Sequence, residues 1–107
     1  MEIKQYEIAL VNLDPTIGSE IRKTRPCVVI SPNEMNKYLQ TIVIAPLTSS
    51  LKSYPTRVEI KQTKIEGWIA LDQIRTIDRT RLINKLGKLT TPEIESVKAV
   101  IMETYVD

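Results

Sequence analysis

The chain has 107 residues, of which 42% are hydrophobic and 26% charged, with a formal net charge of +2. This length is typical of one domain, so we expect a single unit over residues 1–107. No apolar run approaches the ~20 residues of a membrane span, and the mixed charges at the N-terminus are not those of a signal peptide, so we expect a cytoplasmic protein. The one cysteine, Cys27, lies in an apolar run, which favours a small buried side chain.

The charge is distributed unevenly along the chain. Four acidic residues and one lysine give residues 91–107 a net charge of −3, which leaves +5 on residues 1–90. A basic body is compatible with a nucleic-acid or other anionic partner, although a solvated surface also carries such charge. The sequence has no histidine, which together with a single cysteine excludes Cys/His zinc sites and Ser-His-Asp or Cys-His catalytic sets. Its three glycines form no phosphate-binding loop motif.

Short runs of β-branched and aliphatic residues, separated by turn-forming residues, dominate the first 90 positions. They predict strands at Glu7–Leu13, Cys27–Ile30, Thr41–Leu47, Arg57–Ile60, Gly67–Leu71 and Lys85–Leu89. Six short strands favour a small antiparallel barrel or sandwich over a parallel α/β sheet, which needs ~10–15-residue helices between strands. The polar segment Asp14–Lys23, with Gly18 available for a left-handed backbone, forms a loop long enough to be functional or mobile.

Two helices are predicted from their caps. In "SPNEMNKYL" Ser31 can cap the helix, with Pro32 as its first residue and Glu34 as the reciprocal partner of a capping box. In "TTPEIESVKAVIMETYVD" Thr91 caps the helix and Pro92 opens it. The first helix is inserted between strands, and the second ends the chain.

The C-terminal helix carries an apolar stripe at spacings of about three and four, formed by Ile94, Val97, Ala99, Val100, Ile101 and Tyr105. We expect this stripe to pack on the core, with a dimer face as the alternative. A further short turn is predicted at Arg79–Leu82, with Asp78 as its cap.

Polar residues stand at the ends of several predicted strands. They are Glu20 and Arg25 around the first loop, Thr48, Ser49 and Ser50 after the third strand, and Asp72, Gln73 and Arg75 after "WIAL". Taken singly, each is an ordinary turn or surface residue.

Taken together, the segments "LDPT", "TRPCVVISP", "APLTS" and "LDQIRTID", followed by a terminal acidic helix, resemble the MazF/PemK family of bacterial toxin endoribonucleases over nearly the whole chain. The resemblance implies a mainly β fold, a small SH3-like antiparallel β-barrel with a short inserted helix and a C-terminal helix, that pairs as a homodimer. It also implies metal-independent, sequence-specific cleavage of single-stranded RNA such as mRNA, which arrests translation and growth. The implied partner is an antitoxin whose acidic C-terminal segment occupies the RNA groove.

The resemblance also assigns catalytic residues. The family's active-site arginine matches Arg25 in "TRP" and its threonine matches Thr48 in "PLTS", with Ser49 beside it. One branch of the family adds an arginine two residues before the aspartate of the "DQ" element and a histidine in the first loop. This sequence has Ala70 at that position and no histidine, so that acid-base assignment does not transfer.

The expected reaction is attack of a ribose 2′-oxygen on the adjacent phosphate, leaving 2′,3′-cyclic phosphate and 5′-hydroxyl ends. A guanidinium and a hydroxyl donor suit the charge that develops on the phosphate oxygens. Arginine is a poor general base, so Glu20, Asp72, water or a nucleotide phosphate is left to accept the 2′-hydroxyl proton.

RNA binding is expected from phosphate contacts and from one base contact. Gln73 is suited to a base edge, and the phosphate contacts are expected from Lys23, Arg75, Arg79 and Arg81. Trp68 lies in an apolar run and is expected in the core rather than as a stacking platform. Sequence recognition is expected from the segments Asp14–Lys23 and Leu51–Pro55.

Two other functions remain open. The same fold could serve a non-enzymatic toxin that binds and poisons DNA gyrase, because a shared fold does not fix function. A regulatory RNA-binding module without activity is the other alternative.

Overall fold

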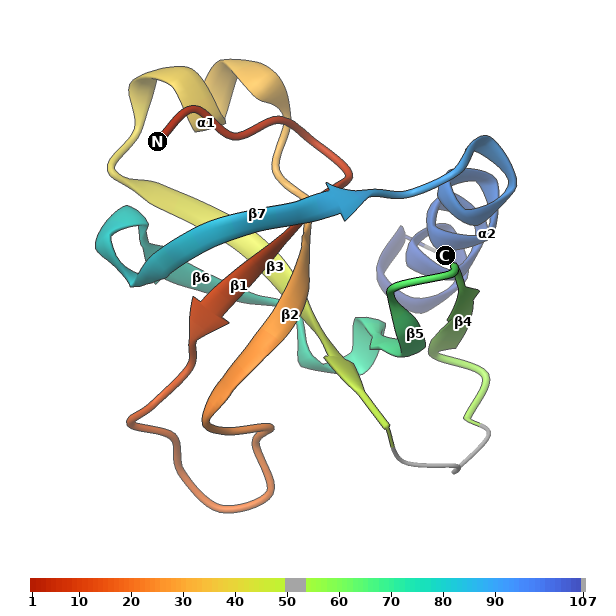
Figure 1. The fold of residues 1–107 in the computed structure, drawn as a ribbon. Coiled ribbons are helices and arrows are strands. Elements are labelled where there is room, and N and C mark those ends of the chain that lie inside the picture. The colour runs from red at the N-terminus through yellow and green to blue at the C-terminus, as the bar shows by residue number, and fades with distance from the viewer. Residues whose placement is uncertain (50–53, 107) are drawn as a thin grey trace.

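The computed structural model describes residues 1–49 and 54–106, which form a strongly curled antiparallel sheet with two helices (Figure 1). The strands are β1 (Glu7–Asn12), β2 (Thr24–Val29), β3 (Thr41–Thr48), β4 (Arg57–Lys61), β5 (Glu66–Ala70), β6 (Arg75–Asp78) and β7 (Leu82–Lys88). Helix α1 is formed by Asn33–Tyr38 and α2 by Thr91–Ile101, which continues as a π-helical segment to Val106. No helix in the described ranges is long and apolar enough to cross a membrane.

The strands are hydrogen-bonded in the order β4-β5-β3-β2-β1-β7, with β6 paired to β3 beside this path. All of these pairs are antiparallel. The mainly β prediction, with one inserted and one C-terminal helix, is therefore confirmed. Among the described residues β4, β6 and β7 each pair with one neighbour, so the sheet is not closed and is a barrel only in a loose sense.

Alternation along the strands divides the apolar residues between two clusters. Cys27 and Val29 of β2 point into a cluster inside the curl of the sheet, with Ile42 and Ile44 of β3. Val28, between them in sequence, joins the other cluster, which lies against α2. Strands β2 and β3 contribute buried residues to both clusters, so each of these central strands is covered on both faces of the sheet.

Strand β6 was not predicted. Only Ile77 of its four residues is buried, so the segment has no apolar run to mark it. It forms because it pairs with β3, where Ile77 stands opposite Ile42 and Arg75 opposite Ile44. Strand β2 also begins earlier than expected, at Thr24, and therefore includes Arg25.

Helix α1 lacks the predicted capping box. Its N-cap is Pro32, without a side-chain hydrogen bond. Ser31, expected as the cap, is buried instead, where its hydroxyl donates to Oδ1 of Asn36 and accepts from the backbone N–H of Val43. Burial explains the difference. A buried hydroxyl must find hydrogen-bond partners in the core, whereas the end of this six-residue helix is exposed and its N–H groups can bond to water.

Helix α2 begins one residue earlier than predicted. Thr90, not Thr91, is the N-cap, and its hydroxyl accepts from the N–H of Glu93 while the Glu93 carboxylate accepts from the N–H of Thr90. The reciprocal bonds require the glutamate three residues after the cap, and only Thr90 satisfies that spacing. The predicted turn capped by Asp78 is confirmed, since its side chain accepts from the N–H of Thr80.

The stripe of α2 packs on the core, as expected for most of its members. Val97 is fully buried, and Ile94, Val100 and Ile101 pack against the cluster beneath the helix. Ala99 is exposed and Tyr105 is 54% exposed, so these two lie outside the buried stripe. The helical period turns Ala99 away from the sheet, whereas the half-exposed Tyr105 still reaches the body of the protein, because its hydroxyl donates to the carbonyl of Leu71.

Candidate active site

The site forms where β3 exchanges one neighbour for another. Strand β3 pairs with β2 up to Pro46, opposite Cys27, and then pairs with β5 from Leu47. The prolines at positions 26 and 46 have no N–H to donate, so the β2–β3 ladder is weak at this point. The two strands separate there, and each exposes polar residues beyond the break.

Arg25 and Thr48 lie at this break. Cys27 and Pro46 form the last β2–β3 pair, and Arg25 and Thr48 each lie two residues beyond it on their own strands. Since side chains two residues apart share a face of a strand, both point to the side that carries Cys27. The Nε of Arg25 donates to the carbonyl of Arg22 at 3.0 Å.

A second arginine approaches from β6. Arg75 stands opposite Ile44 and donates from Nη1 to the carbonyl of Leu13 at 3.3 Å. Burial raises the pKa of the Cys27 thiol to about 12, and the charges of Arg75 and Arg25 act in the opposite direction. Neither guanidinium forms an ion pair within the described part of the chain. Cys27 itself is fully buried, as predicted.

Two adjoining hollows open at Arg75 and Thr48, and Arg25 is in the lining of neither. One, of about 390 Å³, is lined by Ser19, Glu20, Ile21, Pro46, Asp72, Gln73, Ile74 and Arg75. The other, of about 460 Å³, is lined by Ser19, Ile21, Thr48, Tyr54, Arg57, Asp72 and Gln73. Four residues belong to both, so we call the two hollows together the groove. Gln73 fixes one wall of it, because its Oε1 accepts from the N–H of Ile21 in the first loop at 2.7 Å.

Asp72 is held by Arg57 across the groove. The Arg57 Nε donates to Oδ1 of Asp72 at 2.9 Å and Nη2 to Oδ2 at 3.3 Å, while the Thr56 hydroxyl donates to Oδ1 at 3.1 Å. Partial burial alone would raise the pKa of Asp72, but the hydrogen bonds and the charge of Arg57 outweigh it and hold that pKa below its usual value. Arg57 was not predicted as a site residue.

The other predicted site residues are distributed more widely. Glu20 lines the groove, and its carboxylate accepts from the N–H of Ile17 at 2.7 Å. Lys23 is exposed at the neck of the first loop, by which we mean the point where the two ends of the Asp14–Lys23 segment meet; its N–H donates there to Asp14 Oδ1. Arg81 donates to the carbonyls of Asn12 and Asp14 at the same neck.

Arg79 is the predicted phosphate contact that the fold separates from the groove. Its guanidinium donates to the carbonyls of Met1, Asn36 and Leu39, beside α1. These bonds satisfy carbonyls at the C-terminal end of a short helix, which is a structural use of an arginine. The Asp14–Lys23 segment does border the groove, whereas most of Leu51–Pro55 and Ser50 lie outside the described residues.

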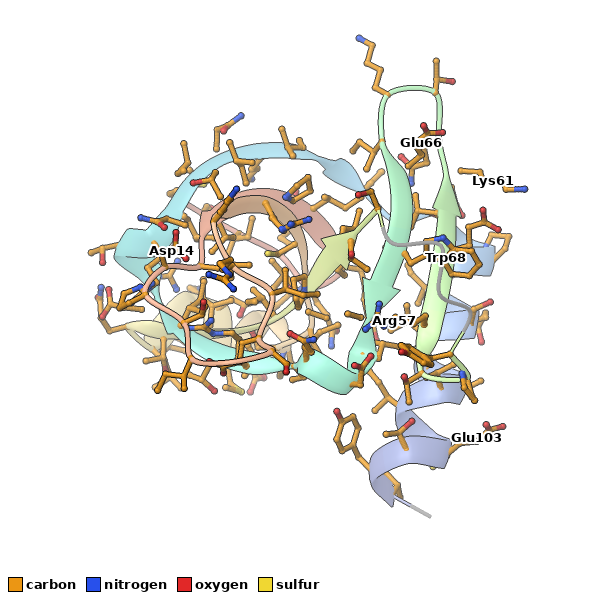
Figure 2. The ribbon with its side chains drawn as sticks, turned by 90° about the horizontal axis from the view of Figure 1, so that it is seen from below. Asp14, Arg57, Lys61, Glu66, Trp68 and Glu103 are labelled. Atoms are coloured by element: carbon orange, nitrogen blue, oxygen red, sulfur yellow. The ribbon has the colours of Figure 1, made fainter. Side chains whose placement is uncertain are left out.

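Trp68 is not part of either apolar cluster, contrary to the prediction. It is half-buried and lines a separate hollow with Ser49, Glu59, Lys61 and Glu66. Alternation on β5 explains this position, because buried Ile69 points to the core and its neighbour must point outward. Figure 2 shows Trp68, Lys61 and Glu66 on the β4–β5 pair, with Arg57 further along the same pair.

Sequence reasoning missed Arg57 and Tyr54. The alternation in "TRVEIK" does place Arg57 on the face of β4 opposite to buried Val58 and Ile60. Its proximity to Asp72 depends on the register that aligns Arg57 with Ala70, two residues before the aspartate. Alternation within one strand does not specify its register against another strand. Tyr54 lies outside any regular element and gave no signal.

Comparison with known proteins identifies the family. Residues 4–105 match the family described as PemK-like, MazF-like toxin of type II toxin-antitoxin system. An endoribonuclease MazF from Staphylococcus saprophyticus is 34% identical over 105 residues, covering 92% of this chain and 88% of the relative.

Solved structures share the fold. MazF from Deinococcus radiodurans has a TM-score of 0.88 at 24% identity, covering 96% of both chains. An endoribonuclease in complex with its cognate antitoxin, from a mycobacterial species, has a TM-score of 0.81 at 19% identity, covering 94% of this chain and 92% of that one. With a family match across nearly the whole sequence, the chain belongs to the PemK-like, MazF-like toxins of type II toxin-antitoxin systems.

Proposed function

We propose that this toxin endoribonuclease cleaves single-stranded RNA by attack of a ribose 2′-oxygen on the neighbouring phosphate, without a metal ion. The products are a 2′,3′-cyclic phosphate and a 5′-hydroxyl end. The proposal is supported by the end of the β2–β3 pairing at Cys27 and Pro46, which leaves Arg25 and Thr48 each two residues beyond the last pair, with Thr48 lining the groove. A phosphate bound there meets a permanent positive charge and a hydroxyl together.

Arg25 stabilises the charge that develops on the non-bridging oxygens. Its planar donors match phosphate oxygens, and its charge persists at every relevant pH. It also has a proton to give the leaving 5′-oxygen. Thr48 donates a hydrogen bond to the same oxygens, a contribution typically worth on the order of 100-fold in rate. Ser49 is adjacent in sequence but lines the hollow around Trp68 and neither hollow of the groove, so we assign it no contact with the reacting phosphate.

The general base is better assigned to Glu20 or to a water molecule than to Asp72. A base works best with a pKa near the working pH, whereas that of Asp72 is lowered and its oxygens are occupied by Arg57 and Thr56. Glu20 lines the groove on the loop side. We assign Asp72 to holding Arg57, and phosphate binding along the groove to Arg75 with Lys23 and Arg81 at the loop neck.

We further propose that the cognate antitoxin binds over the groove with an acidic C-terminal segment. Carboxylates can pair with Arg25 and Arg75, which carry no ion-pair partner among residues 1–49 and 54–106. The mycobacterial endoribonuclease was solved with its cognate antitoxin, and MazF from D. radiodurans with MazE. The toxin acts as a homodimer in the cytoplasm, where cleavage of mRNA arrests translation and growth.

The test is cleavage of a long unstructured RNA in EDTA, with mapping of the cut sites and their end groups. Arg25→Ala and Thr48→Ala should each lose on the order of 100-fold or more in the cleavage rate. Lys98→Ala, an exposed change on α2, is the matched control and should cleave like the wild type. Activity that requires a divalent metal, or no cleavage by the folded wild type, would overturn the proposal, and the second result would favour the gyrase-binding alternative.

A further inference from the structure

We propose that Tyr54, backed by Arg57, is a stacking subsite for one unpaired nucleobase next to Thr48. The inference rests on the proposed function, because the base that stacks there belongs to the RNA strand whose phosphate meets Arg25 and Thr48. It adds a binding residue that no sequence motif singles out, and it names the part of the substrate that this residue contacts.

The ring of Tyr54 contacts a cation and is still partly exposed to the groove. The guanidinium carbon of Arg57 lies 5.1 Å from the centroid of the ring, within the range of a cation–π contact. Tyr54 nevertheless remains 45% exposed, and it lines the same hollow as Thr48. A base can therefore stack on the ring from the groove side, as bases do on aromatic side chains in single-stranded nucleic-acid sites.

The support beneath the ring is rigid. The Arg57 side chain is only 8% exposed and is fixed by two hydrogen bonds to Asp72, which also accepts from Thr56. Because the carboxylate is paired with a guanidinium, it presents less negative charge to an approaching phosphate. Because Arg57 is already held by Asp72, the cation beside the ring loses little conformational freedom when a base stacks on Tyr54, which favours binding.

A base edge could be read in the same hollow. Gln73 lines it with Tyr54, and the amide oxygen of Gln73 is already used by the N–H of Ile21. The amide nitrogen of Gln73 is then the group that can donate to an acceptor on the base. Stacking with an adjacent donor is the usual combination for recognition of a splayed base.

Trp68 is an alternative aromatic side chain, on β5, and it is less suited to the role. Its hollow is lined by two carboxylates, Glu59 and Glu66, and one lysine, Lys61. Lys61 lies 3.8 Å from a Glu59 carboxylate oxygen, and this leaves Glu66 to repel the phosphates of a strand. Tyr54 has no such excess of negative charge beside it, since its carboxylate neighbour Asp72 is paired with Arg57.

The experiment measures RNA affinity by fluorescence anisotropy at fixed salt. The probe is a short labelled single-stranded RNA that carries the mapped cut motif with deoxyribose at the attacking position, or oligouridine if no cut is mapped. Tyr54→Leu should weaken binding by about 5- to 100-fold, the range for losing one stacked base. Tyr54→Phe keeps the ring and should bind within about twofold of the wild type.

Tyr38→Leu is the matched control. Tyr38 is 75% exposed and also contacts a cation, with Lys37 Nζ 5.4 Å from its ring centroid, but it lies on α1 away from the groove. Its loss should leave RNA affinity unchanged. Wild-type affinity in Tyr54→Leu, or an equal loss in Tyr54→Phe and Tyr54→Leu, would overturn the subsite.

Probes with one abasic position each locate the stacked base. One position should weaken binding to the wild type and have no further effect in Tyr54→Leu, because base and ring form a single contact. RNA that binds without being cut would refute the proposed cleavage while the Tyr54 comparison still decides the subsite. A folded wild type that binds no RNA would overturn both.

Discussion

Gly67 packs against the backbone of Thr48, and Gly67→Ala should lower both the stability of the fold and the rate of RNA cleavage. Gly67 has a φ of +145°, which side chains rarely tolerate. A Cβ built there would lie 3.0 Å from the backbone carbonyl oxygen of Thr48. Because Thr48 stands opposite Trp68 in the β3–β5 pair, the strain is transmitted to the end of β3 that carries the candidate catalytic threonine.

The expected magnitude follows from these two features. A non-glycine residue in a sparsely populated backbone region costs of order 1–3 kcal/mol. At about 2 kcal/mol, the Tm should fall by about 10 °C for a chain of this length. Relief of the 3.0 Å contact requires Thr48 to move by a few tenths of an ångström. Since a 1 Å misplacement can cost about 100-fold, the cleavage rate should fall by about 3- to 10-fold.

The assay combines thermal unfolding with single-turnover RNA cleavage at a temperature where both proteins are folded. Gly87→Ala is the control, because its Cβ would meet only the flexible end of the Ile65 side chain, at 3.3 Å, and its φ is not positive. It should change stability by less than about 1 kcal/mol and leave cleavage intact. If Gly67→Ala unfolds and cleaves like the wild type, the close packing of β5 against the Thr48 backbone is wrong.

Three further predictions concern stability. Thr90→Ala should lower the free energy of unfolding by about 1 kcal/mol through loss of the capping box, and Thr91→Ala by much less, as urea titrations can compare. Asn36→Ala should cost about 1–3 kcal/mol by the same assay, because the buried hydroxyl of Ser31 loses the acceptor for its proton and keeps only the bond from the Val43 N–H; an unchanged midpoint would contradict this. Native Cys27 should resist alkylation until the protein unfolds, because it is fully buried and its pKa is raised to about 12. Since the unfolded thiol ionises first, stability should be lost above pH 9, relative to Cys27→Ala, by up to about 1.4 kcal/mol per pH unit.

Six of the seven strands in the described part of the chain were predicted from apolar patterns in the sequence. The central segments were expected because buried residues alternate or run together there, as in β3 and β4. β6 was missed because its polar residues are carried into the sheet by pairing with β3, a long-range interaction that no local pattern reports. The cap of α2 was missed by one residue although the spacing of Thr90 and Glu93 was visible in the sequence.

The site was predicted less completely than the fold. Arg25 and Thr48 were selected from a family resemblance, since nothing in the chemistry of one arginine or one threonine singles it out. In the structure each lies two residues beyond Cys27 and Pro46, the last pair of the β2–β3 register. Arg57 and Tyr54 could not be found without the β4–β5 register and the turn before β4, and Trp68 was misplaced because an apolar run does not reveal which of its residues face outward.

The most direct test of the proposed mechanism replaces a single ribose. An RNA oligonucleotide with the mapped cut motif is compared with the same oligonucleotide carrying deoxyribose on the 5′ side of the scissile phosphate, in EDTA. Cleavage by 2′-oxygen attack predicts that the ribose form is cut to 2′,3′-cyclic phosphate and 5′-hydroxyl ends, and that the deoxyribose form is bound but left intact at that position. Cleavage of the deoxyribose form at the same phosphate would contradict the mechanism, because water would then be the attacking group.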